Sequence, residues 1–149
     1  MNALKICKRD VTVCERDLSV TDAALLMRSS HMGAVVVIDR TNGGRRVTGM
    51  LTDRDIVVAV VAAKQDPVRL CVGDIMTSQP VTAAAWEDEW HLMRRMRLHG
   101  FRRLPVVDDN KDLIGIVALD DLLRFSAAFL SELGEVGMRE TFIEQETRS

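Results

Sequence analysis

The polar residues with the clearest chemical potential are Thr52, Asp53, Arg54 and Asp55, which stand directly before the apolar run IVVAVVAA at 56–63. The first amides of a helix are free to donate to phosphate, and the guanidinium of Arg54 adds paired, charge-assisted donors. The carboxylate of Asp55 only accepts hydrogen bonds, so it suits the two hydroxyls of a ribose. A phosphate-binding group beside a ribose-binding group indicates a nucleotide site.

The same residues also have a purely structural interpretation. Thr52 and Asp55 have the spacing of a capping box, in which the threonine hydroxyl accepts an early helix amide and the acidic side chain bonds back. Two observations favour an additional role. Arg54 puts a cation where the helix dipole disfavours one unless an anion lies nearby. An aspartate, Asp121, also recurs downstream where Ala118 replaces the threonine. Both interpretations stay open at this point.

An internal repeat must position these residues. The segment GMLTDRDI at 49–56 matches GIVALDDL at 115–122, and GAVVVID at 33–39 matches RRLPVVD at 102–108. The loop that follows residue 39 is longer than its counterpart, DNKDLIG, and hairpin loops are where such insertions belong. The chain therefore reads as two copies of one unit.

Each copy shows the same order of elements. Apolar residues at helical spacing, which we predict to face the core, follow a short extended segment at 11–13 and another at 80–82. The two stripes are Val20, Ala23, Ala24 and Met27 in the first copy and Trp86, Trp90, Met93 and Met96 in the second. The acidic residues Asp22, Glu87, Asp88 and Glu89 are predicted to lie in first helical turns. The order in each copy is β-α-β-β-α.

The predicted fold class is α/β (α+β), with tandem β-α-β-β-α repeats packed sheet to sheet, because a unit of about 60 residues buries too little surface alone. We assign residues 7–66 to the first repeat, 67–79 to a linker, 80–134 to the second repeat and 135–149 to a C-terminal tail. The tail is predicted to be a helix that docks on the repeats or on another molecule. The apolar run at 56–63 has no polar face, so we predict a homodimer with these helices at the interface.

Composition excludes several functional classes. A net charge of −2 and an aromatic content of 4% do not provide the basic surface and stacking platforms of nucleic-acid binders, so no nucleic-acid partner is expected. The longest apolar stretch is far shorter than the roughly 20 residues that cross a bilayer, and residues 1–10 lack the apolar segment of a secretory signal. We expect no membrane association and a cytoplasmic location. Neither the three cysteines nor the three histidines have the spacing of a disulfide framework or metal site.

The tandem units resemble the cystathionine β-synthase (CBS) domain pair, also called a Bateman module. The resemblance rests on the family's Gly-hydrophobic-x-Thr/Ser-x-x-Asp motif, present as GMLTDRD, on its weaker echo GIVALDD, and on FRRLPVVD. It covers approximately residues 11–133. The resemblance implies a regulatory module that binds an adenosyl compound between its repeats: AMP, ADP, ATP, S-adenosylmethionine or NAD(H). AMP and ATP are the favoured ligands, and no cofactor is required.

The resemblance also implies which residues form a first nucleotide cleft. They are Thr52, Arg54, Asp55, Val81, Thr82 and Arg103. Asp55 would hold the ribose, Thr52 and the two arginines the phosphate, and the backbone at 81–82 the adenine edge. Adjacent strand residues point to opposite faces, so only one of Arg102 and Arg103 can enter the cleft. We favour Arg103 because of the resemblance.

A second, weaker cleft follows from the same comparison. Its residues are Thr12, Val13, Ala34 and Asp121. Ala118 lacks the hydroxyl of Thr52, and Asp120 stands where Arg54 stands in the first repeat. The added negative charge repels phosphate. We expect this cleft to bind weakly, to prefer an uncharged adenosine-like group or to stay empty.

No catalytic residues are predicted. The sequence lacks a GxSxG elbow, a phosphate-binding P-loop and an HExxH pair, so we do not expect an enzyme. The leading hypothesis is a sensor that signals through a conformational change to an effector protein that the sequence does not identify. The alternative is a structural module for dimerisation or partner interaction with no bound nucleotide.

Overall fold

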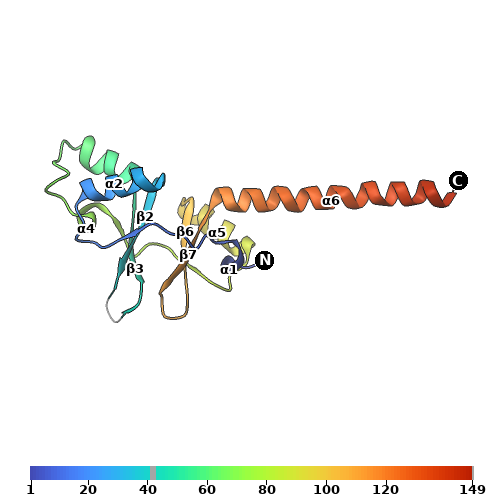
Figure 1. Ribbon diagram of the computed structural model, residues 1–149, viewed down its shortest axis with the longest axis horizontal. Coiled ribbons are helices and arrows are strands. Elements are labelled where there is room, and N and C mark those ends of the chain that lie inside the picture. Colours follow the sequence, from blue (N-terminus) through green and yellow to red (C-terminus); the bar gives the residue numbers. More distant parts are fainter. Residues whose placement is uncertain (41–42, 149) are drawn as a thin grey trace.

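The computed structural model describes residues 1–40 and 43–148. In this structure the chain forms two small sheets with helices packed against them, and one long helix runs away from this body (Figure 1). The first sheet has the strand order β1-β2-β3-β4 and the second the order β5-β6-β7. Each half contains the order β-α-β-β-α, so the predicted fold class is confirmed.

The first half is built around a parallel and an antiparallel strand pairing, β1 with β2 and β2 with β3. Its elements are β1 (Val13–Cys14), α2 (Val20–Ser30), β2 (Ala34–Asp39), β3 (Arg46–Thr52), α3 (Asp53–Ile56) and the π-helical segment η2 (Val57–Val61). Ser19 caps α2 by accepting the amide of Asp22 at 3.0 Å. The longer loop predicted after residue 39 includes residues 41–42, which lie outside the described residues.

The second half repeats both pairings, β5 parallel to β6 and β6 antiparallel to β7. Its elements are β5 (Ala83–Ala84), α5 (Glu89–His99), β6 (Arg103–Val107), β7 (Leu113–Ala118) and α6 (Leu119–Arg148). The opening strand begins two residues later than predicted in the first half, at Val13, and three residues later in the second half, at Ala83. In the second half the reason is visible, since Pro80 has no amide to donate to a ladder and the carbonyl of Thr82 is taken by Arg95.

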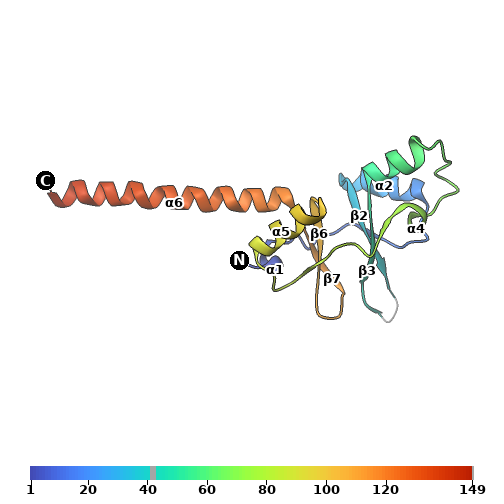
Figure 2. The same cartoon turned by 180° about the vertical axis from the view of Figure 1, so that it is seen from behind.

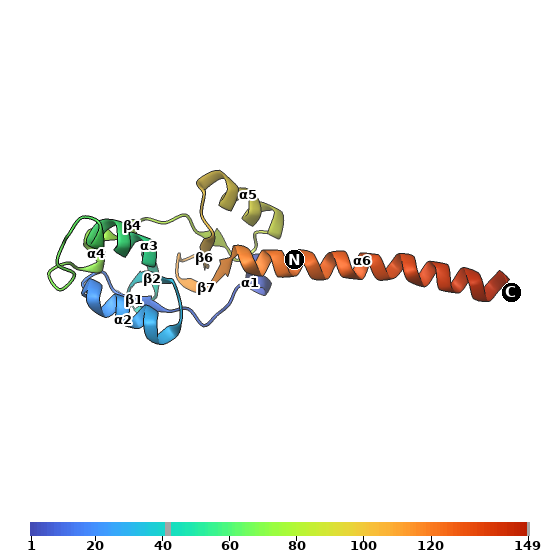
Figure 3. The same cartoon turned by 90° about the horizontal axis from the view of Figure 1, so that it is seen from above.

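The two halves pack sheet to sheet, as predicted. Val36 and Ile38 of β2 form one buried cluster with Leu113 and Ile116 of β7. The backbones also meet, because the amide of Leu113 donates to the carbonyl of Arg45 at 2.9 Å. Seen from above, the elements of the two halves lie side by side (Figure 3). This junction fixes the relative position of residues that are distant in sequence.

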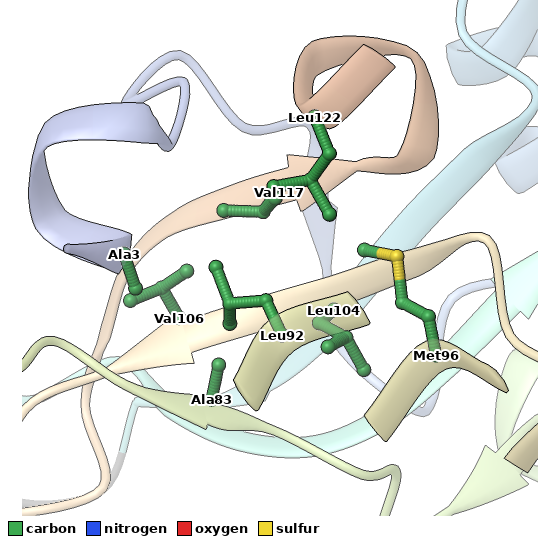
Figure 4. Close-up of a cluster of buried hydrophobic side chains, with 8 residues drawn as sticks. All are labelled: Ala3, Ala83, Leu92, Met96, Leu104, Val106, Val117 and Leu122. Carbon is green, nitrogen blue, oxygen red and sulfur yellow. The ribbon is translucent and has the colours of Figure 1, made fainter. Parts of the chain in front are cut away.

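Each half is completed by a short helix from elsewhere in the chain. Helix α1 (Ala3–Ile6) lies on the second half, where buried Ala3 packs beside Val106 and Leu92 (Figure 4). Helix α4 (Val72–Ile75) packs on the first half, and β4 (Thr77–Ser78) pairs with β3. The segment 67–79, predicted to be a linker, therefore contributes a helix and a strand to the first half.

The prediction that the two tryptophans of the second half face the core is wrong. Trp86 is 71% exposed and Trp90 is 63% exposed, whereas the buried residues of α5 are Leu92 and Met96. Successive helix residues are separated by about 100°. Trp90 therefore lies on the side opposite Leu92, and Trp86 precedes the helix altogether. In the first half Val20, Ala23 and Met27 are buried as predicted, but Ala24 is exposed.

Glu87 differs from the prediction as well. It precedes α5 instead of forming its first turn, and it is only 5% exposed. Its Oε1 accepts the amide of Ala84 at 2.9 Å and Nη2 of Arg95 at 3.0 Å. Arg95 also donates to the carbonyl of Thr82 at 2.8 Å. Glu87 thus joins α5 to the strand that opens the second half.

The apolar run and the C-terminal tail are both exposed. Only Val60 of η2 is buried, while Val57, Val58 and Val61 face outward. The tail continues α6 as one helix that projects from the body (Figures 1 and 2), so it does not dock on the repeats as one prediction had it. Within the described residues, no helix combines the length and apolar character needed to span a membrane.

Candidate functional site

A groove between the two halves contains most of the residues predicted for the first cleft. Its volume is about 560 Å³, within the range of cavities that hold small molecules. The lining residues are Met50, Thr52, Asp53, Arg54, Asp55, Thr77, Pro80, Val81, Gly100, Phe101, Arg102, Arg103, Ala118, Leu119 and Asp120. The groove thus combines the β3–α3 corner of the first half with the start of β6 and the β7–α6 corner of the second.

The β3–α3 corner is held by the predicted capping box. Thr52 ends β3, and its Oγ1 accepts the amide of Asp55 at 3.2 Å. In return, Oδ2 of Asp55 accepts the amide of Thr52 at 2.8 Å and its hydroxyl at 2.7 Å. None of these three bonds involves Oδ1 of Asp55, which has no hydrogen-bond partner among the described residues. The structural interpretation is therefore correct for one carboxylate oxygen, and the other stays available to a ligand.

Three guanidinium groups and three carboxylates line the groove. Arg102 lies 3.7 Å from Asp120, while Asp53 accepts the amide of Arg54 at 2.8 Å. Across the described part of the chain, no ion pair joins Arg54 or Arg103 to a carboxylate. Those two arginines are the free cations of the groove, and an anionic ligand would meet both.

Arg102 and Arg103 both line the groove, so the expectation that only one could enter is wrong. Strand alternation does not apply to this pair because β6 begins at Arg103 and Arg102 precedes it. Sequence reasoning also missed Phe101, Pro80 and Thr77. The sequence feature that could have identified Phe101 is the adjacent Gly100. This glycine has a φ of 68°, ends α5 and turns the chain toward the groove.

Only one of the two residues predicted to contact the adenine edge lines the groove. Val81 lines the groove and Thr82 does not. The carbonyl of Thr82 instead accepts Nη1 of Arg95 at 2.8 Å, which removes it as a ligand acceptor. Val81, Pro80 and Phe101 together give the groove an apolar wall.

None of the residues predicted for the second cleft lines this groove. Val13 and Ala34 are ladder residues, and the carbonyl of Thr12 accepts the amide of Val36 at 3.0 Å. Both carboxylate oxygens of Asp121 already bind groups of the same chain. Its Oδ2 accepts the amide of Ala118 at 3.1 Å, and its Oδ1 pairs with Nζ of Lys8 at 2.9 Å.

The cysteines and histidines do not form a site within the described residues. No group of three or more His, Cys, Asp or Glu side chains there could hold a metal ion. Cys7, Cys14 and Cys71 are free thiols. Burial, with a smaller contribution from the charge of Glu15, raises the pKa of Cys14 to about 11.

Comparison with known proteins identifies the family and the fold of the chain. The chain matches the family described as "CBS domain" over residues 3–62 and 72–128. It is 32% identical over 134 residues to the MK0525 protein of Methanopyrus kandleri. The match covers 88% of this chain but only 65% of that protein. This chain thus spans less than two thirds of that relative's length.

Two solved structures show the same fold. The CBS domain protein PAE2072 from Pyrobaculum aerophilum, complexed with AMP, has a TM-score of 0.77 and 26% identity. That match covers 91% of this chain and 99% of the other. The CBS domain pair of protein MJ0100, in complex with 5′-methylthioadenosine and S-adenosyl-L-methionine, has a TM-score of 0.74 and 23% identity, covering 86% and 97%.

Proposed function

The chain belongs to the CBS domain family and carries two copies of the domain, and from this premise we propose that it is a regulatory module that binds an adenosyl nucleotide. The site is the groove between the halves. The observation that carries the proposal is the free oxygen of Asp55 in a groove that also contains the unpaired cations Arg54 and Arg103. The AMP complex of PAE2072 supports the ligand class.

Each side chain has a distinct role in this proposal. Oδ1 of Asp55 accepts the ribose hydroxyls, and Arg54 and Arg103 bind the phosphate through charge-assisted hydrogen bonds. The hydroxyl hydrogen of Thr52 is already donated to Asp55. Thr52 therefore positions the carboxylate instead of binding phosphate. The adenine lies along the apolar wall at Val81.

AMP is the preferred first ligand among the adenosyl compounds, with ATP second. Among the described residues, two of the three guanidinium groups in the groove have no ion-pair partner, but Asp53, Asp55 and Asp120 line it too. A single phosphate can be satisfied by Arg54 and Arg103, whereas a triphosphate brings further negative charge toward these carboxylates. S-adenosylmethionine carries a sulfonium cation where AMP has its phosphate, which brings a positive charge toward Arg54 and Arg103.

Signalling follows from the position of the groove at the junction of the halves. A ligand that contacts both halves favours one relative pose over another, provided that it binds the two poses unequally. We assign the module no catalytic role. The carboxylates that line the groove, Asp53, Asp55 and Asp120, are assigned to ligand binding and to the local contacts described above, not to proton transfer.

A second copy of the chain is the proposed partner for the η2 face. Val57, Val58 and Val61 are exposed next to each other on this face, and Val61 is 67% exposed. Burying such a face against its symmetric copy removes apolar surface from water in both chains. This face also favours the second candidate function, a dimerisation module whose groove stays empty.

Thermal melting with AMP, ATP, S-adenosylmethionine and NADH separates the two candidates. A ligand at 100 times its Kd adds about 2.7 kcal/mol to the free energy of unfolding, which raises the Tm of a chain this long by roughly 5–10 °C. Arg54→Gln and Arg103→Gln should each weaken AMP binding. Arg139→Gln, on the exposed distal part of α6, is the matched control and should bind AMP normally. If none of the four compounds changes the Tm, the sensor proposal fails and the dimerisation module gains.

A further inference from the structure

Lys8 occupies in the second half the position that Thr77 occupies in the first. Thr77 pairs with Met50 of β3, and Lys8 forms the equivalent antiparallel bridge to Ile116 of β7. Both backbone hydrogen bonds between Lys8 and Ile116 are 2.9 Å long. Met50 and Ile116 are themselves equivalent, since each follows the glycine of its repeat. The register therefore equates Lys8 with Thr77.

The residue before each of them confirms this equivalence. The sulfur of Met76 lies over Gly49, and the sulfur of Cys7 lies over Gly115. A Cβ atom at either glycine would collide with that sulfur. Both segments therefore cross their strands at the same place and in the same direction.

The two side chains meet the same partner differently. Thr77 lines the groove in which Asp55 keeps one oxygen free. Lys8 instead extends its ammonium to Asp121, the equivalent of Asp55, at 2.9 Å. Since Asp121 also accepts the amide of Ala118, both of its oxygens are used.

The contact is shielded on the side of Asp121, while 57% of the Lys8 side chain is exposed. The backbone of Lys8 is fixed on β7, and the helix that precedes it is anchored by buried Ala3. The side chain of Asp121 is only 9% exposed, and Arg124 adds a second cation 4.0 Å away. A ribose hydroxyl is a neutral donor, so it forms a weaker bond to a shielded carboxylate than an ammonium does. A ligand diol would have to displace the lysine to reach Asp121.

We propose that Lys8 is a built-in cation that blocks the second cleft, so that each chain takes a single nucleotide, in the groove at Asp55. The inference rests on the proposed function and adds the residue that sets the stoichiometry. The block does not require a ligand, because the ammonium already fills the place of the ribose hydroxyls. Lysine in place of threonine is thus a third difference between the two clefts, beside Ala118 in place of Thr52 and Asp120 in place of Arg54.

Reciprocal substitutions test the block by isothermal titration with AMP and with adenosine. The wild-type chain should bind one equivalent of AMP. Lys8→Thr should add a second equivalent, seen most clearly with adenosine because Asp120 does not repel an uncharged ligand. Thr77→Lys should weaken AMP binding by about tenfold or more, the effect of one charge-assisted hydrogen bond. Lys5→Thr, on the exposed side of α1, is the matched control and should bind as the wild type does.

The outcomes distinguish this inference from the proposed function. If the wild type binds AMP but Lys8→Thr still takes one equivalent of AMP and of adenosine, the block is refuted and the groove proposal stands. Wild-type affinity in Thr77→Lys would refute it too. If the wild type binds no adenosyl compound, the proposed function fails. A cooperative melt of each variant shows that it is folded.

Discussion

Replacing Asp55 by asparagine separates its two roles. In the structure Oδ2 accepts both the amide and the hydroxyl of Thr52, at 2.8 Å and 2.7 Å, while Oδ1 has no partner among the described residues. Asparagine keeps one oxygen, which can still accept the amide of Thr52. It places an NH₂ group, a donor, where the ligand hydroxyls need an acceptor. Asp55→Asn should thus damage the ligand site much more than the helix start.

The expected magnitudes follow from the bonds involved. A hydrogen bond to a charged group contributes about 1.5–3 kcal/mol, and each 1.4 kcal/mol is a factor of ten. AMP binding should therefore weaken roughly 10- to 150-fold. Loss of the negative charge near the start of α3 costs about 0.3–1 kcal/mol. For a chain this long, that lowers the Tm by roughly 1–4 °C.

Isothermal titration and thermal melting of the same preparations measure both effects. Thr52→Ala is the complementary variant: it removes the cap, worth about 1 kcal/mol, but leaves the carboxylate in the groove. It should lower the Tm while weakening AMP binding less than Asp55→Asn does. If Asp55→Asn binds AMP as tightly as the wild type, the carboxylate serves only the helix and the proposed ribose contact is incorrect.

Four further outcomes are expected. The pKa of about 11 keeps the thiol of Cys14 protonated, so iodoacetamide at pH 8 should modify the partly exposed Cys71 first, as mass spectrometry of the peptides can show. Because an unfolded thiol loses its proton near pH 8.5, Cys14 should also lower the free energy of unfolding as the pH rises from roughly 9 to 11. Glu87→Ala leaves the amide of Ala84 without its acceptor and removes the ion pair of Arg95, which keeps its bond to the carbonyl of Thr82, so it should destabilise the chain by about 1–3 kcal/mol. Glu89→Ala, which removes only a surface ion pair, should cost under about 1 kcal/mol in the same denaturation assay. Val61→Glu should convert a dimer to a monomer in light scattering; an unchanged mass would exclude the η2 face as the interface.

The sequence was sufficient to predict the repeated unit and most of the residues that meet in the groove. Period-2 and period-3.6 patterns identify strands and helices, and the recurrence of GMLTDRDI as GIVALDDL aligns the two halves. Thr52, Arg54, Asp55, Val81 and Arg103 do line one groove. Whether they bind a nucleotide is still a prediction.

The misses have local and long-range causes. The tryptophans were assigned to the core because a helical stripe drawn through Trp86 assumes a helix that begins before Glu89. Strand alternation predicts that only one of Arg102 and Arg103 enters the groove, but this rule applies only within a strand, and Arg102 precedes β6. The ion pair between Lys8 and Asp121 could not be predicted, since it depends on the N-terminal segment crossing to the far half.

The positions of α1 and α4 determine whether this protein can be divided into fragments that each contain one repeat. Residues 72–78 complete the half that precedes them, and residues 3–8 complete the half farthest from them in sequence. A fragment cut between the repeats would therefore lose a piece of its own interior and keep one that belongs to its neighbour. Because each repeat takes part of its interior from outside its own span, the pair should denature in one cooperative transition.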